Sequence, residues 1–292
     1  MSLRLGLVQT VVVSSVKMAK EALKTHDVEF SGRPALVGQQ KLTYNGLDVA
    51  FAPYNDYWKE MRKICVTHLF NASRVHHFRP VREDEKDRAE DEVHGFSRDN
   101  IKAVLMNVFV GATDTSAATM TWAMTNVMKN PRVMEKAQKE VKDLIGNKGF
   151  VDEDDLQKLP YIKAILKETF RLNPLGPIIP RETTKSCMID GYEIPAKTLV
   201  YLNGWAISRD PEVWERPDEF DPDRFISGDN RRFCPGIHMG IATLELAIAN
   251  LLYKFDWEMP AGIKIQDLDF DITPGIVMHK KNPFCLVATK YI

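Results

Sequence analysis

Apolar residues recur along much of this chain at the spacing of an α-helix. After residue 236 they stand at Ile237, Ile241, Leu244, Ile248 and Leu251, at intervals of four, three, four and three. That pattern predicts a helix with one apolar face. Further helices are expected at about 16–25, 56–69, 131–145 and 159–172.

The longest expected helix covers residues 101–129 and is stopped by Asn130-Pro131. It is apolar around most of its circumference and, at 1.5 Å per residue, about 40 Å long. Asp114 at its centre would cost about 2.5–3.5 kcal/mol inside a bilayer. We therefore expect a helix buried inside a soluble domain. The apolar run at 5–16 is too short to span a bilayer, so no membrane anchor is visible.

Extended structure is expected in three places: a β-branched strand at 10–13, proline-rich segments over 174–201, and a hairpin over 267–292. The sequence thus predicts one mainly α domain over 1–292 with a minor β part. Its regions are an N-terminal strand and helix (1–55), a second helical region (56–78), a charged connector (79–100) and the remainder (101–292).

Charge and cysteine content narrow the function classes. The 39 basic and 40 acidic residues leave a net charge of −1, which gives no reason to expect nucleic acid as a partner. Cys65, Cys187, Cys234 and Cys285 lie far apart and without the spacing of a zinc site. Free thiols in a reducing compartment are therefore expected.

Cys234 directly precedes a predicted helix, in Arg232-Phe233-Cys234-Pro235-Gly236. Amide groups and the helix dipole stabilise an anion there, and a thiolate is a soft ligand for haem iron. Pro235 suits a first helical turn, and Gly236 lets the backbone approach a flat ring. A buried structural cysteine is the alternative that these residues leave open.

Two helical pairs could carry charge interactions. Glu168 and Arg171 are three apart, so they lie on one helix face and can form an ion pair. Trp58 and Arg62 are four apart, and both side chains are donors that could meet a carboxylate. An ordinary surface pair and an ordinary amphipathic helix explain them equally well.

Asp114 and Thr115 interrupt the long apolar helix. An acid beside an alcohol deep in a core is expensive unless it is satisfied or used. The pair could relay protons, with a local distortion of the helix making room for it. A run of small residues that eases helix packing is the alternative.

The order of these motifs resembles that of the cytochrome P-450 family: Trp-x-x-x-Arg, acid–threonine helix, Glu-x-x-Arg, the segment 220–225, then Arg-x-Cys-x-Gly. Residues 203–211 are similar to plant microsomal members. The resemblance implies the cytochrome P-450 fold, here incomplete. It also implies haem b as cofactor, with Cys234 as the axial iron ligand. The residues it implies for haem binding are Trp58, Arg62, Arg232, Cys234 and Gly236.

The resemblance also implies the reaction. One atom of dioxygen would enter a small organic substrate, such as a plant secondary metabolite, with electrons from NADPH delivered by NADPH–cytochrome reductase. Asp114 and Thr115 would be catalytic and handle protons. A structural triad would consist of Glu168, Arg171 and Arg224. The location implied is the cytosolic face of the endoplasmic reticulum membrane.

The sequence departs from the family pattern in two ways. Ser227 and Asn230 stand where the family's haem loop has phenylalanine and glycine. Only 52 positions lead from Arg62 to Asp114, where the family places several helices that cover the substrate. These departures leave a second hypothesis open, a truncated and inactive relative that binds haem weakly or not at all.

Overall fold

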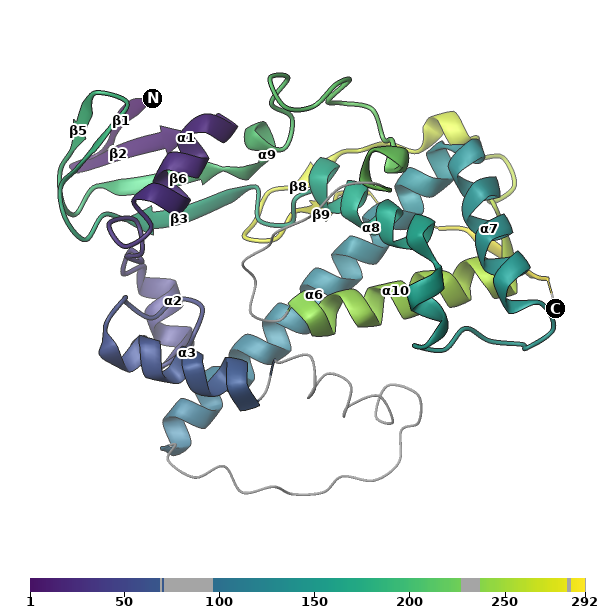
Figure 1. Ribbon diagram of the computed structural model, residues 1–292, viewed down its shortest axis with the longest axis horizontal. Coiled ribbons are helices and arrows are strands. Elements are labelled where there is room, and N and C mark those ends of the chain that lie inside the picture. Colours follow the sequence, from purple (N-terminus) through teal and green to yellow (C-terminus); the bar gives the residue numbers. More distant parts are fainter. Residues whose placement is uncertain (69, 71–96, 227–236, 283–284, 292) are drawn as a thin grey trace. The chain divides into compact units, whose positions relative to one another are not determined.

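The computed structural model describes residues 1–68, 70, 97–226, 237–282 and 285–291. The described residues fall into two compact units: unit 1 takes in those of 1–69, 88–113 and 176–217, and unit 2 the others. Helix α6 (Arg98–Lys129) contributes to both units (Figure 1). A single domain over 1–292 therefore stays a prediction.

Unit 1 is built on a four-stranded sheet (Figure 1). The strand order is β1-β2-β6-β3, with β2 parallel to β6 and the other pairs antiparallel. Val11 on β2 faces Val200 on β6. The strand expected at 10–13 is confirmed as part of β2. The bounds are β1 (Ser2–Leu5), β2 (Val8–Val13), β3 (Ile178–Glu182) and β6 (Leu199–Asn203).

A small core joins this sheet to the first helix, with Val13, Ala22, Phe30 and Leu202 all buried. Within the proline-rich segment, a turn at Asp190-Gly191 links β4 (Cys187–Ile189) to β5 (Tyr192–Ile194). The helices of unit 1 besides α6 are α1 (Val16–Lys20), the π-helical turn η1 (Glu21–Thr25), α2 (Val37–Leu42), α3 (Asp56–His68) and α9 (Gly204–Ile207).

Unit 2 packs three helices and the second half of α6 around the larger core. Its fully buried side chains include Val127, Ile162, Ile165, Ile248 and Leu252. The helices expected from the apolar periodicity are confirmed. Their bounds are α7 (Pro131–Ile145), α8 (Pro160–Leu172) and α10 (Ile237–Lys254), with short 3-10 turns η2 (Asp155–Lys158), η3 (Pro222–Phe225) and η4 (Ile265–Asp267).

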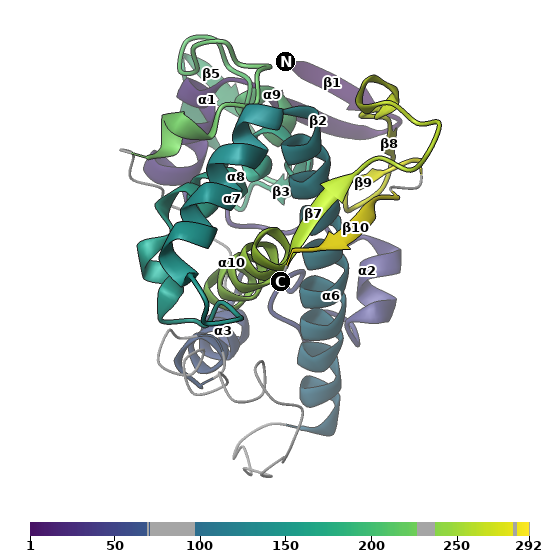
Figure 2. The same ribbon diagram turned by 90° about the vertical axis from the view of Figure 1, so that its right-hand side faces the viewer.

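The C-terminal hairpin is only partly as expected. β8 (Ile272–Thr273) does pair with β9 (His279–Lys280). The last strand, β10 (Val287–Lys290), instead pairs with β7 (Phe255–Glu258), which follows α10 directly (Figure 2). Leu286 packs against the core beside this pair, so burial of an apolar side chain favours the more distant strand.

Helix α6 differs from expectation at its centre. It is an uninterrupted α-helix over Arg98–Lys129, without the local distortion expected at Asp114. The Asp114 side chain is also not buried, since about half of it (47%) is exposed. Downstream, Trp122 and Val127 are fully buried, whereas upstream Phe109 is 71% exposed. In the part of the chain that the structure describes, the upstream half is therefore only partly covered, with Ala103 and Val104 buried and Phe109 exposed.

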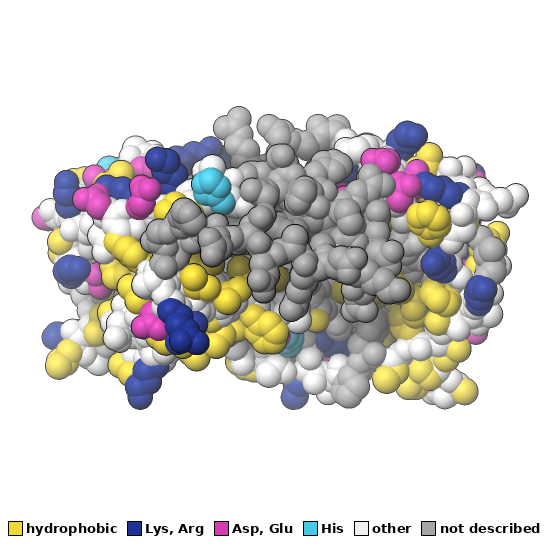
Figure 3. Space-filling model, turned by 90° about the horizontal axis from the view of Figure 1, so that it is seen from below, with side chains coloured by type: hydrophobic (Ala, Val, Ile, Leu, Met, Phe, Trp, Pro, Cys, Tyr) yellow, Lys and Arg dark blue, Asp and Glu magenta, His cyan; other side chains and the backbone are white. Residues whose placement is uncertain are grey.

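Large apolar side chains reach the surface on one face of the molecule (Figure 3). On α6 they include Ile101, Leu105, Val108, Phe109 and Val110. Even so, within the described ranges, none of the helices has the length and hydropathy needed to span a bilayer.

Candidate active site

Trp58 and Arg62 lie on the same face of α3, as their spacing predicts. The guanidinium of Arg62 stacks over the indole ring of Trp58, 5.3 Å from its centroid, which is a cation–π contact. The indole N–H donates to the carbonyl oxygen of Val49 at 2.9 Å. A propionate could use that N–H only if this hydrogen bond broke.

Two arginines that the sequence analysis did not single out lie close to each other, and one of them, Arg33, is also near Arg62. Gly32 pairs with Glu182 of β3, and a Cβ on Gly32 would come within 2.3 Å of the Glu182 carbonyl oxygen. Only glycine permits this approach, which brings Arg33 to the edge of the sheet beside Arg181. The guanidinium groups donate to nearby backbone carbonyls, Arg33 to Ser31 at 2.7 Å and Arg181 to Pro180 at 3.1 Å.

The charges of these three arginines oppose one another. Burial, and then the charge of Arg62, lower the pKa of Arg33. Burial, and then the charge of Arg33, lower the pKa of Arg181 to about 10. No carboxylate of the described residues forms a salt bridge with any of the three. We call Arg33, Arg62 and Arg181 the arginine cluster; its chemistry fits an anionic group such as a pair of carboxylates.

Glu168, Arg171 and Arg224 meet in unit 2. Glu168 is fully buried and accepts two bonds from Arg171, at 2.7 and 2.8 Å, and one from Arg224 at 3.2 Å. The Asp221 amide adds a fourth at 2.9 Å, and Arg171 also donates to the Glu219 carbonyl oxygen. This hydrogen bonding is what a buried ion pair needs to offset its desolvation.

Asp114 has a histidine partner from the C-terminal hairpin. The Nε2 atom of His279 lies 3.1 Å from Oδ2 of Asp114, and both side chains are about half exposed. The neighbouring hydroxyls of Thr113 and Thr119 donate to carbonyls of their own helix, those of Phe109 and Thr115. In the structure Asp114 is thus a surface acid held by His279, and not a core acid.

Three predicted haem-binding residues, Arg232, Cys234 and Gly236, lie outside the described residues. The described chain resumes at Ile237, where α10 begins as the sequence predicts. Cys65, Cys187 and Cys285 are free thiols, as expected. Burial raises the pKa of Cys65 to about 11, which makes it a poor thiolate at neutral pH.

Arg33, Arg181 and His279 are the candidate residues that sequence reasoning missed. Each is a candidate only because it lies close to a residue far away in the sequence, and the periodicity of a single sequence does not reveal such contacts. Gly32 beside Arg33 was the one local signal, because a glycine within an extended segment marks a close backbone approach.

The fold is that of solved cytochrome P-450 structures. A zebra fish cytochrome P-450, in a structure with progesterone, superposes with a TM-score of 0.83 at 20% identity, over 99% of this chain and 96% of that one. A second zebra fish structure, with abiraterone, gives 0.81. At this identity the likeness establishes the fold alone.

The family follows from sequence comparison. Residues 1–94 and 83–287 match the family described as Cytochrome P-450, and the chain belongs to it. Cytochrome P-450 71B9 of Arabidopsis thaliana is 34% identical over 100% of this chain and 87% of its own length. A 6,7,8-trihydroxycoumarin synthase of Pastinaca sativa is also 34% identical, over 100% and 86%. Membership of this family defines the class of protein, an oxidoreductase of the monooxygenase type. It also implies a haem held by a cysteine thiolate.

The same comparisons locate a gap in the chain. The alignment with the Arabidopsis relative covers 433 positions, whereas this chain has 292 residues, so at least 141 positions have no counterpart here. The two matched segments overlap at 83–94, within the charged connector. This agrees with the expectation that helices are missing between Arg62 and Asp114.

Proposed function

We propose that this chain is a haem-thiolate monooxygenase with Cys234 as the iron ligand and with the arginine cluster and Arg232 binding the haem's carboxylates. The observation that carries the proposal is the arginine cluster, a set of like charges that only an anion would stabilise. Trp58 and Gly236 would line the same cofactor. When bound, the haem would supply the redox chemistry by which dioxygen is split.

The protein's own residues would orient the cofactor and manage protons. The Glu168–Arg171–Arg224 network would hold α8 against η3, a structural role. Asp114 and Thr115 would hold and move protons, since a carboxyl group and a hydroxyl can each accept and donate one. Electrons would come from NADPH through NADPH–cytochrome reductase, at the cytosolic face of the endoplasmic reticulum.

The substrate would be a small organic plant metabolite. Two relatives of about one-third identity are named 6,7,8-trihydroxycoumarin synthase and 5-OH-xanthotoxin synthase. Coumarins are therefore the first substrate class to test with this chain.

A second candidate function is favoured by the exposed upstream half of α6 and by the gap in the alignment. In this alternative the chain is an inactive relative that keeps the motifs and takes up haem weakly or not at all. The missing helices would be those that cover the substrate.

One experiment separates the two. The purified 292-residue chain is titrated with haemin, reduced, and exposed to carbon monoxide. A red-shifted thiolate Soret band that disappears in Cys234→Ala but persists in Cys285→Ala would support the monooxygenase. No uptake of haem would support the inactive relative.

A further inference from the structure

The backbone beside His279 is fixed on both sides. The amide of Met278 donates to the Leu175 carbonyl oxygen at 2.8 Å, and the Met278 carbonyl oxygen accepts from the indole N–H of Trp122 at 2.9 Å. Trp122 is fully buried. β8 adds ladder pairing opposite His279. The histidine therefore projects from a strand with little freedom to move.

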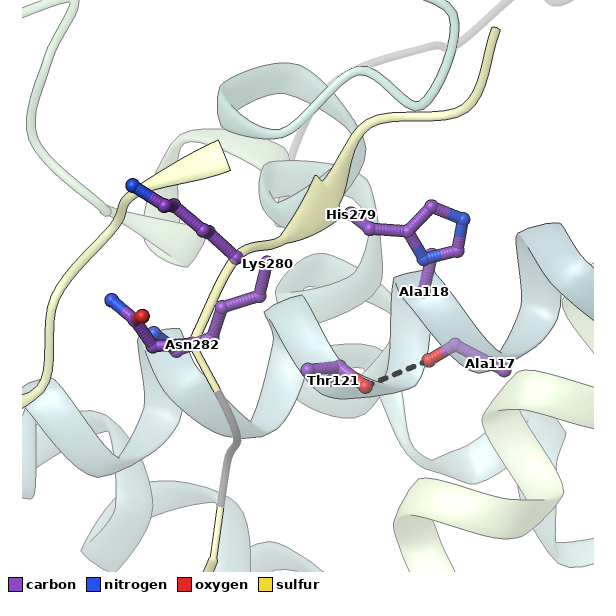
Figure 4. A pocket seen from close by; sticks show the side chains of 7 residues that line it. Ala117, Ala118, Thr121, His279, Lys280 and Asn282 are labelled. Atoms are coloured by element: carbon purple, nitrogen blue, oxygen red, sulfur yellow. Dashed lines mark hydrogen bonds between the residues drawn. The ribbon is translucent and has the colours of Figure 1, made fainter. Parts of the chain in front are cut away.

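The strand presents its side chains to two different acids. Successive residues of a strand point to opposite faces, and His279 and Lys280 do so (Figure 4). The Lys280 amine pairs with Asp269 at 2.9 Å, whereas His279 meets Asp114. Asp114 stands eight residues before Trp122 on α6, hence two turns away on the same face. The contact that anchors the strand thus also aligns the histidine with the acid.

We propose that His279 is the positioning residue for Asp114: its Nε2–H donates to Oδ2 and fixes the direction of the carboxylate. The inference deepens the proposed function, on which it rests, because it names the residue that sets the geometry of the proton-handling acid. The pocket of about 350 Å³ that His279 lines with Ala117, Ala118 and Thr121 gives solvent access to the ring (Figure 4).

The exposure of the pair argues for positioning over stability. A half-exposed polar pair competes with water for its hydrogen bond and contributes little to folding. A rigid strand can nevertheless hold the backbone of a donor in place, so that only the rotation of its side chain remains to be fixed. The expected signature is a change at the carboxylate with an unchanged unfolding midpoint.

The test uses the full chain with ¹³C-labelled aspartate. In His279→Phe the donor is lost, and the carboxyl signal of Asp114 should move. In His279→Gln the amide can still donate, and the signal should stay near its original position. His26→Gln is the matched control, since His26 lies 4.0 Å from Glu21 in unit 1. If the carboxyl signal of Asp114 does not move in His279→Phe, the proposal is overturned.

A second arm reads the haem-loaded chain. His279→Phe should raise the peroxide released per NADPH consumed severalfold, and His279→Gln should restore coupling. Equal coupling in both variants and the unchanged chain would also overturn the positioning role. Failure of the unchanged chain to bind haem would contradict the proposed function instead, and the carboxyl signal, which needs no haem, would then decide the inference.

Discussion

Arg181 is a half-buried cation whose charged surroundings are also cationic. Burial and the charge of Arg33 lower its pKa to about 10, against an ordinary value of 12.5. Because the folded chain binds this proton less tightly than the unfolded chain, the charged form costs stability at neutral pH. The cost is relieved only as the pH rises above about 10.

Arg181→Gln should therefore stabilise the haem-free chain at pH 7, by on the order of 1 kcal/mol. The same change should weaken haem binding, since it removes a cation from the proposed carboxylate site. Urea unfolding and haemin titration measure the two effects. Arg132→Gln, an exposed position on α7, is the control and should alter neither. A haem-free variant less stable than the parent would contradict this account.

Thr115→Ala should leave haem binding intact and divert electrons into peroxide, because the proton relay is weakened and the iron ligand is not. Peroxide per NADPH consumed is the measurement. Thr121→Ala is a matched control on the same helix, since its hydroxyl donates to the Ala117 carbonyl oxygen at 3.0 Å. Identical coupling in the two variants would reduce Thr115 to a packing residue.

For individual residues, the sequence could predict contacts between side chains that are close together in the chain. Glu168 and Arg171 could be paired from the sequence because three residues along a helix place two side chains together. Arg181 and His279 could not. The bridge between Gly32 and Glu182 brings Arg33 close to Arg181, and packing of the strand at His279 on α6 brings Asp114 close to His279. Arg224 was assigned to Glu168 by resemblance, and the structure puts them 3.2 Å apart.

Among helices and strands, too, local features could be predicted from the sequence and long-range partners could not. Helices α7 and α8 could be bounded because proline opens each of them and the apolar residues recur at helical spacing. The partner of β10 could not be predicted, because two open strand edges, β7 and the β8–β9 hairpin, offer the same backbone hydrogen bonds. Packing of Leu286 decides between them, and a sequence does not show packing.

The carboxylate of Glu168 links α8 to η3 through hydrogen bonds, so its removal should strongly lower the free energy of unfolding. Glu168→Gln should cost about 3–5 kcal/mol, since two largely buried arginines lose their counter-charge. Chemical denaturation of the haem-free chain measures this. Asp143→Asn breaks the exposed pair with Lys139 and should have almost no effect. Comparable losses in the two variants would mean that the network adds nothing beyond surface charge.

Helix α10 carries a buried acid that no described hydrogen bond involves. Burial raises the pKa of Glu245 to about 7, although Lys163 and Lys167 oppose the shift. The folded chain then holds the proton more tightly than the unfolded chain, whose pKa is near 4.5. Stability should be greatest below about pH 4.5 as far as this group is concerned, and should fall as the pH rises through about 7.

Glu245→Gln should remove that dependence. Between about pH 4.5 and 7 the free energy of unfolding should fall less steeply with pH in the variant than in the parent, and at pH 8 the variant should be the more stable. Denaturation at a series of pH values measures the slope. Glu135→Gln, on a solvent-facing position of α7, serves as the control. Parallel slopes for parent and Glu245→Gln would contradict the assignment.

At the scale of the whole molecule, the exposed apolar side chains on the upstream half of α6 are the main departure from a well-packed enzyme among the described residues. Leu105 and Phe109 are 59% and 71% exposed, and apolar patches of this kind promote association. Replacing both by serine should lower binding of the dye ANS and change the unfolding free energy by no more than about 0.5 kcal/mol. Val127→Ser, at a fully buried position, should cost about 2 kcal/mol or more. A double variant as unstable as that control would show that the upstream half is covered after all.

The interleaving of the two units has a consequence for synthesis of the protein. Val11 on β2 can pair with Val200 on β6 only after Val200 has been synthesised. At about 5–20 residues per second, the ribosome needs on the order of ten to forty seconds to synthesise the residues between them. Unit 2 closes only when β10 has emerged. From the synthesis of Lys129 until then, the nascent chain carries a finished but uncovered α6. Chaperone supply during translation, more than the final stability, should therefore set how much of this protein a cell accumulates.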